Sequence, residues 1–291
     1  MRMRGWDGEG LPKPLQLVGE IPLIVHIMNY YASYGHTDFV LCLGYAADQI
    51  RAAVQEAQTA FEFARDWRID CVDTGVETPI GERLHLVADR VADEELFFAN
   101  YADVLSDVDL AAMLDSMTSQ PEIDAMLLGV RPQGSFHVVQ SGPDGIVTDL
   151  YSIGDLPLRT NGGYLLLRRA VLDRLGDRKD LVPTVFGELA AVGRLASYTH
   201  DGFWMPADTF KERAALEWLR DSSRLRAQQQ VIERVTADYL AAGSRGRNTA
   251  VFWLSAGSTV SGTVTEARSL FPLGGLFRLS GVSPDAVAGP H

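Results

Sequence analysis

Two aspartates that lie far apart in the sequence have the chemistry and the position to hold a metal ion. Asp103 follows the apolar run 95–100, which predicts a buried strand, and Asp208 directly precedes an expected helix. Ligands in α/β proteins bind at the carboxyl ends of parallel strands, and Mg²⁺ takes one or two carboxylates together with phosphate oxygens. The two residues could therefore share one Mg²⁺. The simpler interpretations are a loop residue for Asp103 and a helix N-cap for Asp208.

A lysine between two prolines is a second candidate for chemistry. Only three of the 26 basic residues are lysines, and one of them, Lys13, stands between Pro12 and Pro14. The restricted backbone angles of proline, and of the residue before it, keep this lysine out of a helix. Lys13 is either part of a rigid surface loop or a charge presented to a phosphate group.

A glycine-bearing loop and an acidic triplet complete the set of candidates. The loop Val72-Asp73-Thr74-Gly75, followed by Gly81-Glu82-Arg83-Leu84 at a helix start, suits close approach of a ligand to the backbone. The triplet Asp107-Val108-Asp109 has the D-x-D form that some nucleotide-sugar glycosyltransferases use to bind a metal. Asp107 is more simply interpreted as the N-cap of a helix that runs to Met117.

Composition excludes several classes of protein. The chain has 291 residues and a net charge of −12, which argues against binding to nucleic acid or to a membrane surface through basic patches. Residues 1–10 contain no apolar signal segment. The only two cysteines, Cys42 and Cys71, lie in apolar runs and are expected to be reduced. We therefore expect a cytoplasmic protein.

The elements that must position these residues alternate between strand and helix. This alternation predicts a doubly wound, mainly parallel α/β sheet. The expected helices span 22–34, 46–60, 84–91, 107–117 and 181–192, and the expected strands span 38–43, 70–72, 95–100 and 125–130.

The pattern changes after residue 135. Residues 136–150 predict two strands joined by a Pro-Asp-Gly turn, which is a small antiparallel extension, and a further strand begins at Asn161. Residues 208–240 predict one or two helices. We expect a main domain over 1–222 and a helical extension over 223–242. The remaining tail, 243–291, is rich in Gly, Ser and Thr, and we expect it to be loosely ordered or disordered, with a small β appendage as the alternative.

These motifs together resemble the sugar-1-phosphate nucleotidyltransferase family, and most nearly its glucose-1-phosphate cytidylyltransferases. The resemblance covers residues 1–218 and implies the family's Rossmann-like, GT-A-like fold. It is carried by an ordered set of segments: KPL, PLIVHIMNYYASYGHTDFVLCLGY, VDTG, GERL, YAD, NGGY and GFWMPADT.

The resemblance also implies roles for individual residues. It assigns Asp103 and Asp208 to Mg²⁺, and Lys13 to the phosphates. Arg2 aligns with the arginine of the family's glycine-rich loop. The remaining assignments are Thr74, Gly81 and Arg83 to the nucleotide, and Asn161, Gly162 and Gly163 to the sugar phosphate.

Several family motifs are altered in this chain. The family begins with a strand and a Gly-Gly-x-Gly-Thr-Arg loop, of which only Met1-Arg2-Met3-Arg4 has a counterpart here. Its Gly-Asp-Gly is Ala102-Asp103-Val104, its Glu-Lys-Pro is replaced around 151–154, and an Arg-Phe-Gly becomes Ser135-Phe136-His137. A missing central strand would leave two strand edges unpaired. We therefore expect the missing strand and loop to be encoded upstream, with Met1 an internal methionine.

The expected reaction joins a nucleoside triphosphate, with CTP favoured, to a sugar 1-phosphate, with glucose 1-phosphate favoured, and releases pyrophosphate. We expect a homo-oligomer that binds Mg²⁺. Two alternatives stay open at this point. One is a degenerate homologue that binds nucleotide or sugar phosphate without turnover, and the other is a glycosyltransferase that uses Asp107 and Asp109.

Overall fold

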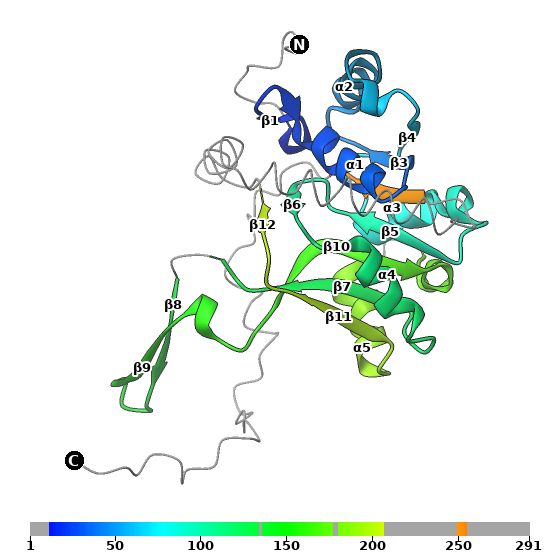
Figure 1. The fold of residues 1–291 in the computed structure, drawn as a ribbon. Helices are drawn as coiled ribbons and strands as arrows, with labels where there is room; N and C mark the ends of the chain where they lie inside the picture. Colours follow the sequence, from blue (N-terminus) through cyan, green and yellow to red (C-terminus); the bar gives the residue numbers. More distant parts are fainter. Residues whose placement is uncertain (1–11, 134–135, 177–179, 207–248, 255–291) are drawn as a thin grey trace. The chain divides into compact units, whose positions relative to one another are not determined.

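A computed structural model of the chain describes residues 12–133, 136–176, 180–206 and 249–254 (Figure 1). The chain divides into two compact units, 1–257 and 258–291, and every described residue belongs to the first. Arg2, Asp208 and the helices expected over 208–240 lie outside the described residues.

A seven-stranded sheet forms the centre of the first unit. Its strand order is β11-β7-β10-β5-β13-β3-β4. Strand β10 is antiparallel to β5 and β7, and all other neighbours in the sheet are parallel. This arrangement confirms the predicted fold class. The strands are β3 (Asp38–Leu43), β4 (Arg68–Asp73), β5 (Leu96–Asn100), β7 (Ala125–Val130), β10 (Thr160–Arg168), β11 (Leu195–His200) and β13 (Thr249–Trp253).

Helices cover both faces of this sheet. Alternate residues of a strand point to opposite faces, so Phe39 and Leu41 pack with α1, α2 and α4, whereas Val40 and Cys42 pack with α3, η6 and α5. None of the described helices could span a membrane. The helices are α1 (Leu23–Ser33), α2 (Ala47–Ala60), α3 (Ile80–Leu86), α4 (Leu110–Thr118) and α5 (Gly187–Ala191), with shorter turns η1 (Lys13–Leu15), η2 (Glu62–Ala64), η3 (Ala88–Val91), η4 (Ile153–Asp155), η5 (Arg169–Arg174) and the π-helical η6 (Leu181–Phe186).

Three two-stranded ladders complete the described structure. Strands β8 (His137–Ser141) and β9 (Val147–Ser152) form the predicted antiparallel hairpin. Strands β1 (Leu17–Val18) and β2 (Ile21–Pro22) form a second ladder. Strands β6 (Val104–Ser106) and β12 (Trp204–Pro206) form the third, which the sequence did not predict.

Two helix starts differ from the prediction. The helix expected at 84–91 begins at Ile80, because Pro79 precedes it and proline suits a helix start, and it ends at Leu86. Asp107 is not the N-cap of α4. Asp109 caps that helix, since its Oδ1 accepts a hydrogen bond from the backbone N–H of Ala112 at 3.0 Å. The N–H of Asp107 donates instead to the Phe203 carbonyl, and the Asp107 carboxylate pairs with His200.

The tail prediction is wrong for residues 249–253. These residues form β13, which lies between β3 and β5, parallel to both and fully buried (Figure 1). The strand is five residues of almost continuous apolar sequence, which suits a strand covered on both faces. Among the described strands, β13 therefore occupies a central position in the sheet, where we expected a strand to be missing.

Candidate active site at the carboxyl edge of the sheet

The described site residues other than Lys13 gather along one edge of the sheet. The parallel strands β3, β4, β5 and β13 all end there, and β10 begins there because it runs the other way. This geometry places Thr74 just after β4, Asp103 just after β5 and Asn161 at the start of β10. It is the edge at which open α/β sheets bind ligands.

Arg83 organises the part of this edge near β3 and β4. Its side chain is buried, and its Nη1 donates to the Leu43 carbonyl at 3.2 Å and to Thr74 Oγ1 at 2.8 Å. Its Nε donates to the carbonyl of Thr78 at 2.9 Å, and its Nη2 to that of Val76 at 3.1 Å. Burial lowers the pKa of Arg83. The four acceptors belong to the protein, so this guanidinium holds the 74–78 loop in place.

The loop after β4 lies against the loop after β3. A Cβ added to Gly44 would come within 2.6 Å of the Gly75 carbonyl oxygen, so only glycine fits at position 44. Gly75 has a positive φ of 90°, a conformation that glycine adopts without strain. Gly81 is buried in the first turn of α3. Thr74 and Arg83, two of the residues assigned to the nucleotide, are therefore joined by a hydrogen bond within one packed group of loops and helix start.

Asp103 follows a tight turn at the end of β5. Ala102 is buried and has a φ of 61°, in the left-handed region. Its N–H donates to Asn100 Oδ1 at 2.7 Å, which fixes the turn. Left-handed backbone favours glycine, and glycine is the residue that the family motif has before its aspartate. The backbone at Asp103 thus keeps a glycine-type conformation although the residue is alanine.

The segment assigned to the sugar phosphate is tied to the same turn. Asn161 Nδ2 donates to Tyr101 Oη at 3.2 Å, and the Tyr101 N–H donates to the Gly163 carbonyl at 3.2 Å. A Cβ on Gly163 would lie 2.7 Å from the Tyr101 ring. The Trp204 indole N–H donates to the Gly162 carbonyl at 2.7 Å. Burial raises the pKa of Tyr101 to about 12, so its phenol stays neutral near pH 7.

Lys13 lies in η1, which contacts both α1 and α2. Pro14 and Leu15, which follow it, are buried and anchor this turn, whereas Lys13 itself is partly exposed. Helix α2 begins just after Gly44, at the edge where the nucleotide group lies.

Asp103 is the one of the two carboxylates assigned to Mg²⁺ that the structure describes. Asp103 directly precedes β6, whose ladder with β12 ends at the pair Val104–Pro206, and Asp208 lies outside the described residues. Carboxylate oxygens are ligands that Mg²⁺ prefers. Within the described ranges no three His, Cys, Asp or Glu side chains gather in a metal-binding group.

Three residues of this region were missed by sequence reasoning. Tyr101 and Trp204 hold the Asn161–Gly163 segment, and His200 pairs with Asp107, with 3.0 Å between Nε2 and Oδ1. Trp204 lies within the motif GFWMPADT, which was the available signal. The D-x-D interpretation loses support, because Asp109 caps α4 and Asp107 is paired with His200.

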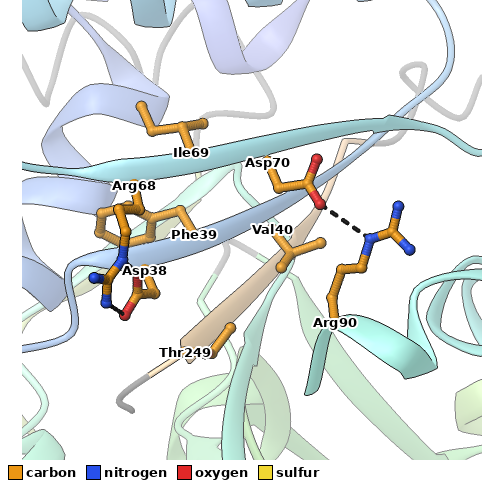
Figure 2. A pocket seen from close by; sticks show the side chains of 8 residues that line it. All are labelled: Asp38, Phe39, Val40, Arg68, Ile69, Asp70, Arg90 and Thr249. Carbon is orange, nitrogen blue, oxygen red and sulfur yellow. Dashed lines mark hydrogen bonds and ion pairs between the residues drawn. The ribbon is translucent and has the colours of Figure 1, made fainter. Parts of the chain in front are cut away.

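A hollow of about 450 Å³ lies at the opposite end of the strands, beside the amino ends of β3, β4 and β13 (Figure 2). Asp70 and Arg90 in its lining are paired at 3.0 Å, and Asp38 is paired with Arg68. These charges neutralise each other. The hollow therefore offers no excess charge for a phosphate or a metal ion.

Comparisons with known proteins were made by family model, sequence and structure. No family model matches the chain. A glucose-1-phosphate cytidylyltransferase from Salmonella typhi is 29% identical over 236 residues, covering 73% of this chain and 89% of the relative. A probable glucose-1-phosphate cytidylyltransferase from Bacillus subtilis is 28% identical and covers 69% and 85%.

Solved structures share the fold. HddC from Yersinia pseudotuberculosis matches with a TM-score of 0.56 and 14% identity, over 76% of this chain and 96% of that one. A UDP-glucose pyrophosphorylase complexed with UDP-glucose matches with a TM-score of 0.54 and 12% identity, over 72% and 90%. At such identities the match supports the fold alone.

Proposed function

The chain is a homologue of the sugar-1-phosphate nucleotidyltransferases, and we propose that it transfers a nucleotidyl group from a nucleoside triphosphate to a sugar 1-phosphate, releasing pyrophosphate. CTP and glucose 1-phosphate are the proposed substrates, because the relatives above are named for this pair. On the same resemblance we expect a cytoplasmic homo-oligomer, and light scattering would test the oligomeric state.

One observation carries the proposal. The turn at Tyr101 joins Asp103 to the Asn161–Gly163 segment, and both lie on the sheet edge that also bears the Thr74–Arg83 group. The residues assigned to metal and sugar phosphate thus lie on the neighbouring strands β5 and β10, and those assigned to the nucleotide lie on the same edge beyond β13 and β3. That arrangement suits a reaction between two bound phosphate compounds.

The reaction requires alignment more than covalent catalysis. An oxygen of the sugar 1-phosphate forms a bond to the α-phosphorus of the nucleoside triphosphate. The bond between that phosphorus and the oxygen bridging to the β-phosphorus breaks, and pyrophosphate leaves with the electron pair. Three phosphate groups and a phosphate nucleophile repel one another, so the protein must neutralise charge and hold the reacting atoms in line.

Different residues of the chain neutralise phosphate charge, contact the two substrates and would hold the metal ion. Lys13 neutralises phosphate charge, and Arg2 is assigned to the departing pyrophosphate. Asn161, Gly162 and Gly163 contact the sugar phosphate, while the Thr74–Gly75 and Gly81 backbone receives the nucleotide in the loop that Arg83 holds. Asp103, with Asp208, would hold a Mg²⁺, which when bound supplies positive charge to the phosphate oxygens.

A second candidate function is binding of nucleotide or sugar phosphate without turnover. Two departures from the family favour it: Ala102 replaces the glycine before Asp103, and Glu-Lys-Pro is replaced around 151–154, where β9 runs into η4. Binding and turnover must therefore be measured separately.

The test is pyrophosphate release by the purified chain with Mg²⁺, glucose 1-phosphate and each of the four common nucleoside triphosphates in turn. We expect release with CTP at a higher kcat/KM than with ATP, GTP or UTP, and none without sugar phosphate. Asp103→Asn is the matched control and should abolish release while keeping the unfolding transition. Nucleotide binding in the absence of any release would instead favour the non-catalytic function.

A further inference from the structure

We propose that the ring of Tyr45 is a stacking platform for the base of the bound nucleotide, with Val76 as a smaller apolar neighbour of that base. This inference rests on the proposed function, because it concerns the nucleotide that the Thr74–Arg83 group would receive. It names the part of the nucleotide that the loops after β3 and β4 contact. Both residues lie in the described ranges.

Tyr45 is an exposed aromatic residue just past the carboxyl end of a buried strand. Residues 39–43 of β3 are buried, whereas Tyr45, two residues after the strand, is 51% exposed. Val76, on the loop after β4, is 50% exposed. These loops lie on the sheet edge at which α/β proteins bind ligands. Two apolar side chains are therefore open to solvent on the neighbouring loops of the candidate nucleotide site.

The backbone beside both side chains is fixed by contacts within the protein. Arg83 donates to the carbonyls of Leu43 and Val76, at 3.2 and 3.1 Å. Gly44 lies so close to the next loop that a Cβ there would come within 2.6 Å of the Gly75 carbonyl oxygen. A side chain carried on backbone that is already ordered loses less entropy when a ligand binds. The two loops thus present a preformed apolar surface.

The charges on these loops favour a base over a phosphate as the group bound here. Asp73 and Glu77 are exposed on the same loop as Val76. Their carboxylates repel the charge of a triphosphate, whereas an uncharged base meets no such repulsion. Every base has a π-face that can stack on an aromatic ring. The neutral ring of Tyr45 therefore suits the base, and the phosphates lie elsewhere along the edge.

Phe63 provides a matched control, because a single exposed aromatic residue is common on protein surfaces. Phe63 is 42% exposed and lies in η2, before the amino end of β4, at the opposite edge of the sheet. Its ring stacks on that of Phe61, with 5.2 Å between the centroids. Phe63→Ala therefore removes an exposed ring without touching the loops after β3 and β4.

The experiment measures binding of CTP and of inorganic tripolyphosphate to the full-length chain with Mg²⁺, by isothermal titration calorimetry. Tyr45→Ala should weaken CTP binding about 10-fold, within the range for one lost base–aromatic stack, and should leave tripolyphosphate affinity unchanged. Tyr45→Phe keeps the ring and should bind CTP as the wild type does. Val76→Ala should weaken CTP binding less than Tyr45→Ala, because it removes a smaller apolar area. Phe63→Ala should leave both affinities unchanged.

Tyr45→Leu keeps an apolar side chain without a ring, so it tests stacking even where Tyr45→Ala fails to fold. We expect Tyr45→Leu to bind CTP more weakly than Tyr45→Phe. Equal CTP affinity in these two variants would overturn this inference, and so would a loss of CTP and tripolyphosphate affinity by the same factor in Tyr45→Ala. In both cases CTP binding by the wild type would leave the proposed function standing. A wild-type chain that binds no nucleoside triphosphate would overturn the proposed function as well.

Discussion

Arg83 Nη1 lies 2.8 Å from Thr74 Oγ1, and this hydrogen bond joins the first turns of α3 to the loop that follows β4. Thr74 Oγ1 in turn donates to the Leu43 carbonyl at 2.9 Å, which reaches the end of β3. One buried guanidinium thereby links two strand ends and one helix at the proposed nucleotide site. A nucleotide that contacts this loop meets a backbone that is already ordered.

Removal of the Arg83 guanidinium should lower the stability of the folded protein. Arg83→Met leaves the carbonyls of Leu43, Val76 and Thr78 without this donor, and we expect a loss of about 2–4 kcal/mol in the free energy of unfolding. Arg83→Lys should recover less than half of that loss, because a single ammonium cannot reach four acceptors arranged around a planar fork. Urea denaturation of the three proteins measures the effect, and an unchanged midpoint in Arg83→Met would contradict it.

Ala102→Gly should stabilise the protein. Alanine at a φ of 61° is strained, and glycine relieves that strain at the expense of a more flexible unfolded chain. We expect a net gain of about 0.5–1 kcal/mol in the free energy of unfolding. Ala46→Gly is a matched comparison, since Ala46 has a φ of 57° at the start of α2. A loss of stability in Ala102→Gly would show that the turn before Asp103 is not strained.

The local part of the fold could be predicted from the sequence, and the non-local part could not. Residues 38–43 form the predicted strand, and α1 lies within the helix predicted over 22–34, because apolar periodicity and flanking Pro and Gly act locally. Strand β13 is equally apolar but only five residues long, in a segment rich in Gly, Ser and Thr. Its place between β3 and β5 depends on strands more than 140 residues earlier, which no local pattern reports.

The same limit applies to the candidate site. The motifs located Thr74, Asp103 and Asn161 correctly on strand ends. They misassigned Asp107, because the N-cap preference is satisfied equally well by Asp109 two residues later. The actual partner of Asp107 is His200, 93 positions further along the chain. The pairing of Asp107 with His200 accompanies the packing of β12 against β6, which joins distant parts of the sequence and which no local pattern predicts.

Strand β13 should be essential for stability. Phe252 is fully buried, and its ring centroid lies 5.3 Å from that of Tyr31 and 5.7 Å from that of Phe39. Phe252→Ala should therefore lower the free energy of unfolding by about 3–5 kcal/mol. Phe136→Ala, at a side chain that is 73% exposed, should change it by less than about 0.5 kcal/mol.

Truncation provides a second measure of the same strand. A chain that ends at Leu254 should keep a cooperative unfolding transition, whereas a chain that ends at Asn248 should lose it, because the edges of β3 and β5 would lack their neighbour. Circular dichroism during thermal unfolding distinguishes the two. Equal transitions in both truncated chains would mean that β13 does not complete the sheet in solution.

Asp124 should make stability depend on pH in the acid range. Its buried carboxylate accepts two hydrogen bonds from Arg194, each at 2.6 Å, and these bonds lower the pKa of Asp124. Because the folded-state pKa lies below the unfolded value near 3.8, the contribution is present above about pH 4 and is lost as the pH falls through the lowered pKa. Asp124→Asn should cost about 1–3 kcal/mol at pH 7, and the difference from wild type should shrink steadily below pH 4. Urea midpoints from pH 7 to pH 2.5 provide the check.

Lys13 distinguishes an enzyme from a protein that only binds its ligands. Arginine supplies 23 of the 26 cationic residues, yet this position carries lysine, whose compact ammonium can sit among several phosphate oxygens where a planar guanidinium does not fit. If the chain is a transferase, Lys13→Ala should lower kcat/KM by about 2–4 kcal/mol of transition-state stabilisation, and Lys13→Arg should recover little of it. Thermal stability should change little, because the buried Pro14 and Leu15 anchor the turn. Steady-state pyrophosphate release by the wild type and both variants measures the effect. Turnover that survives Lys13→Ala unchanged would place the phosphate site elsewhere, and ligand binding without any wild-type turnover would favour the non-catalytic function.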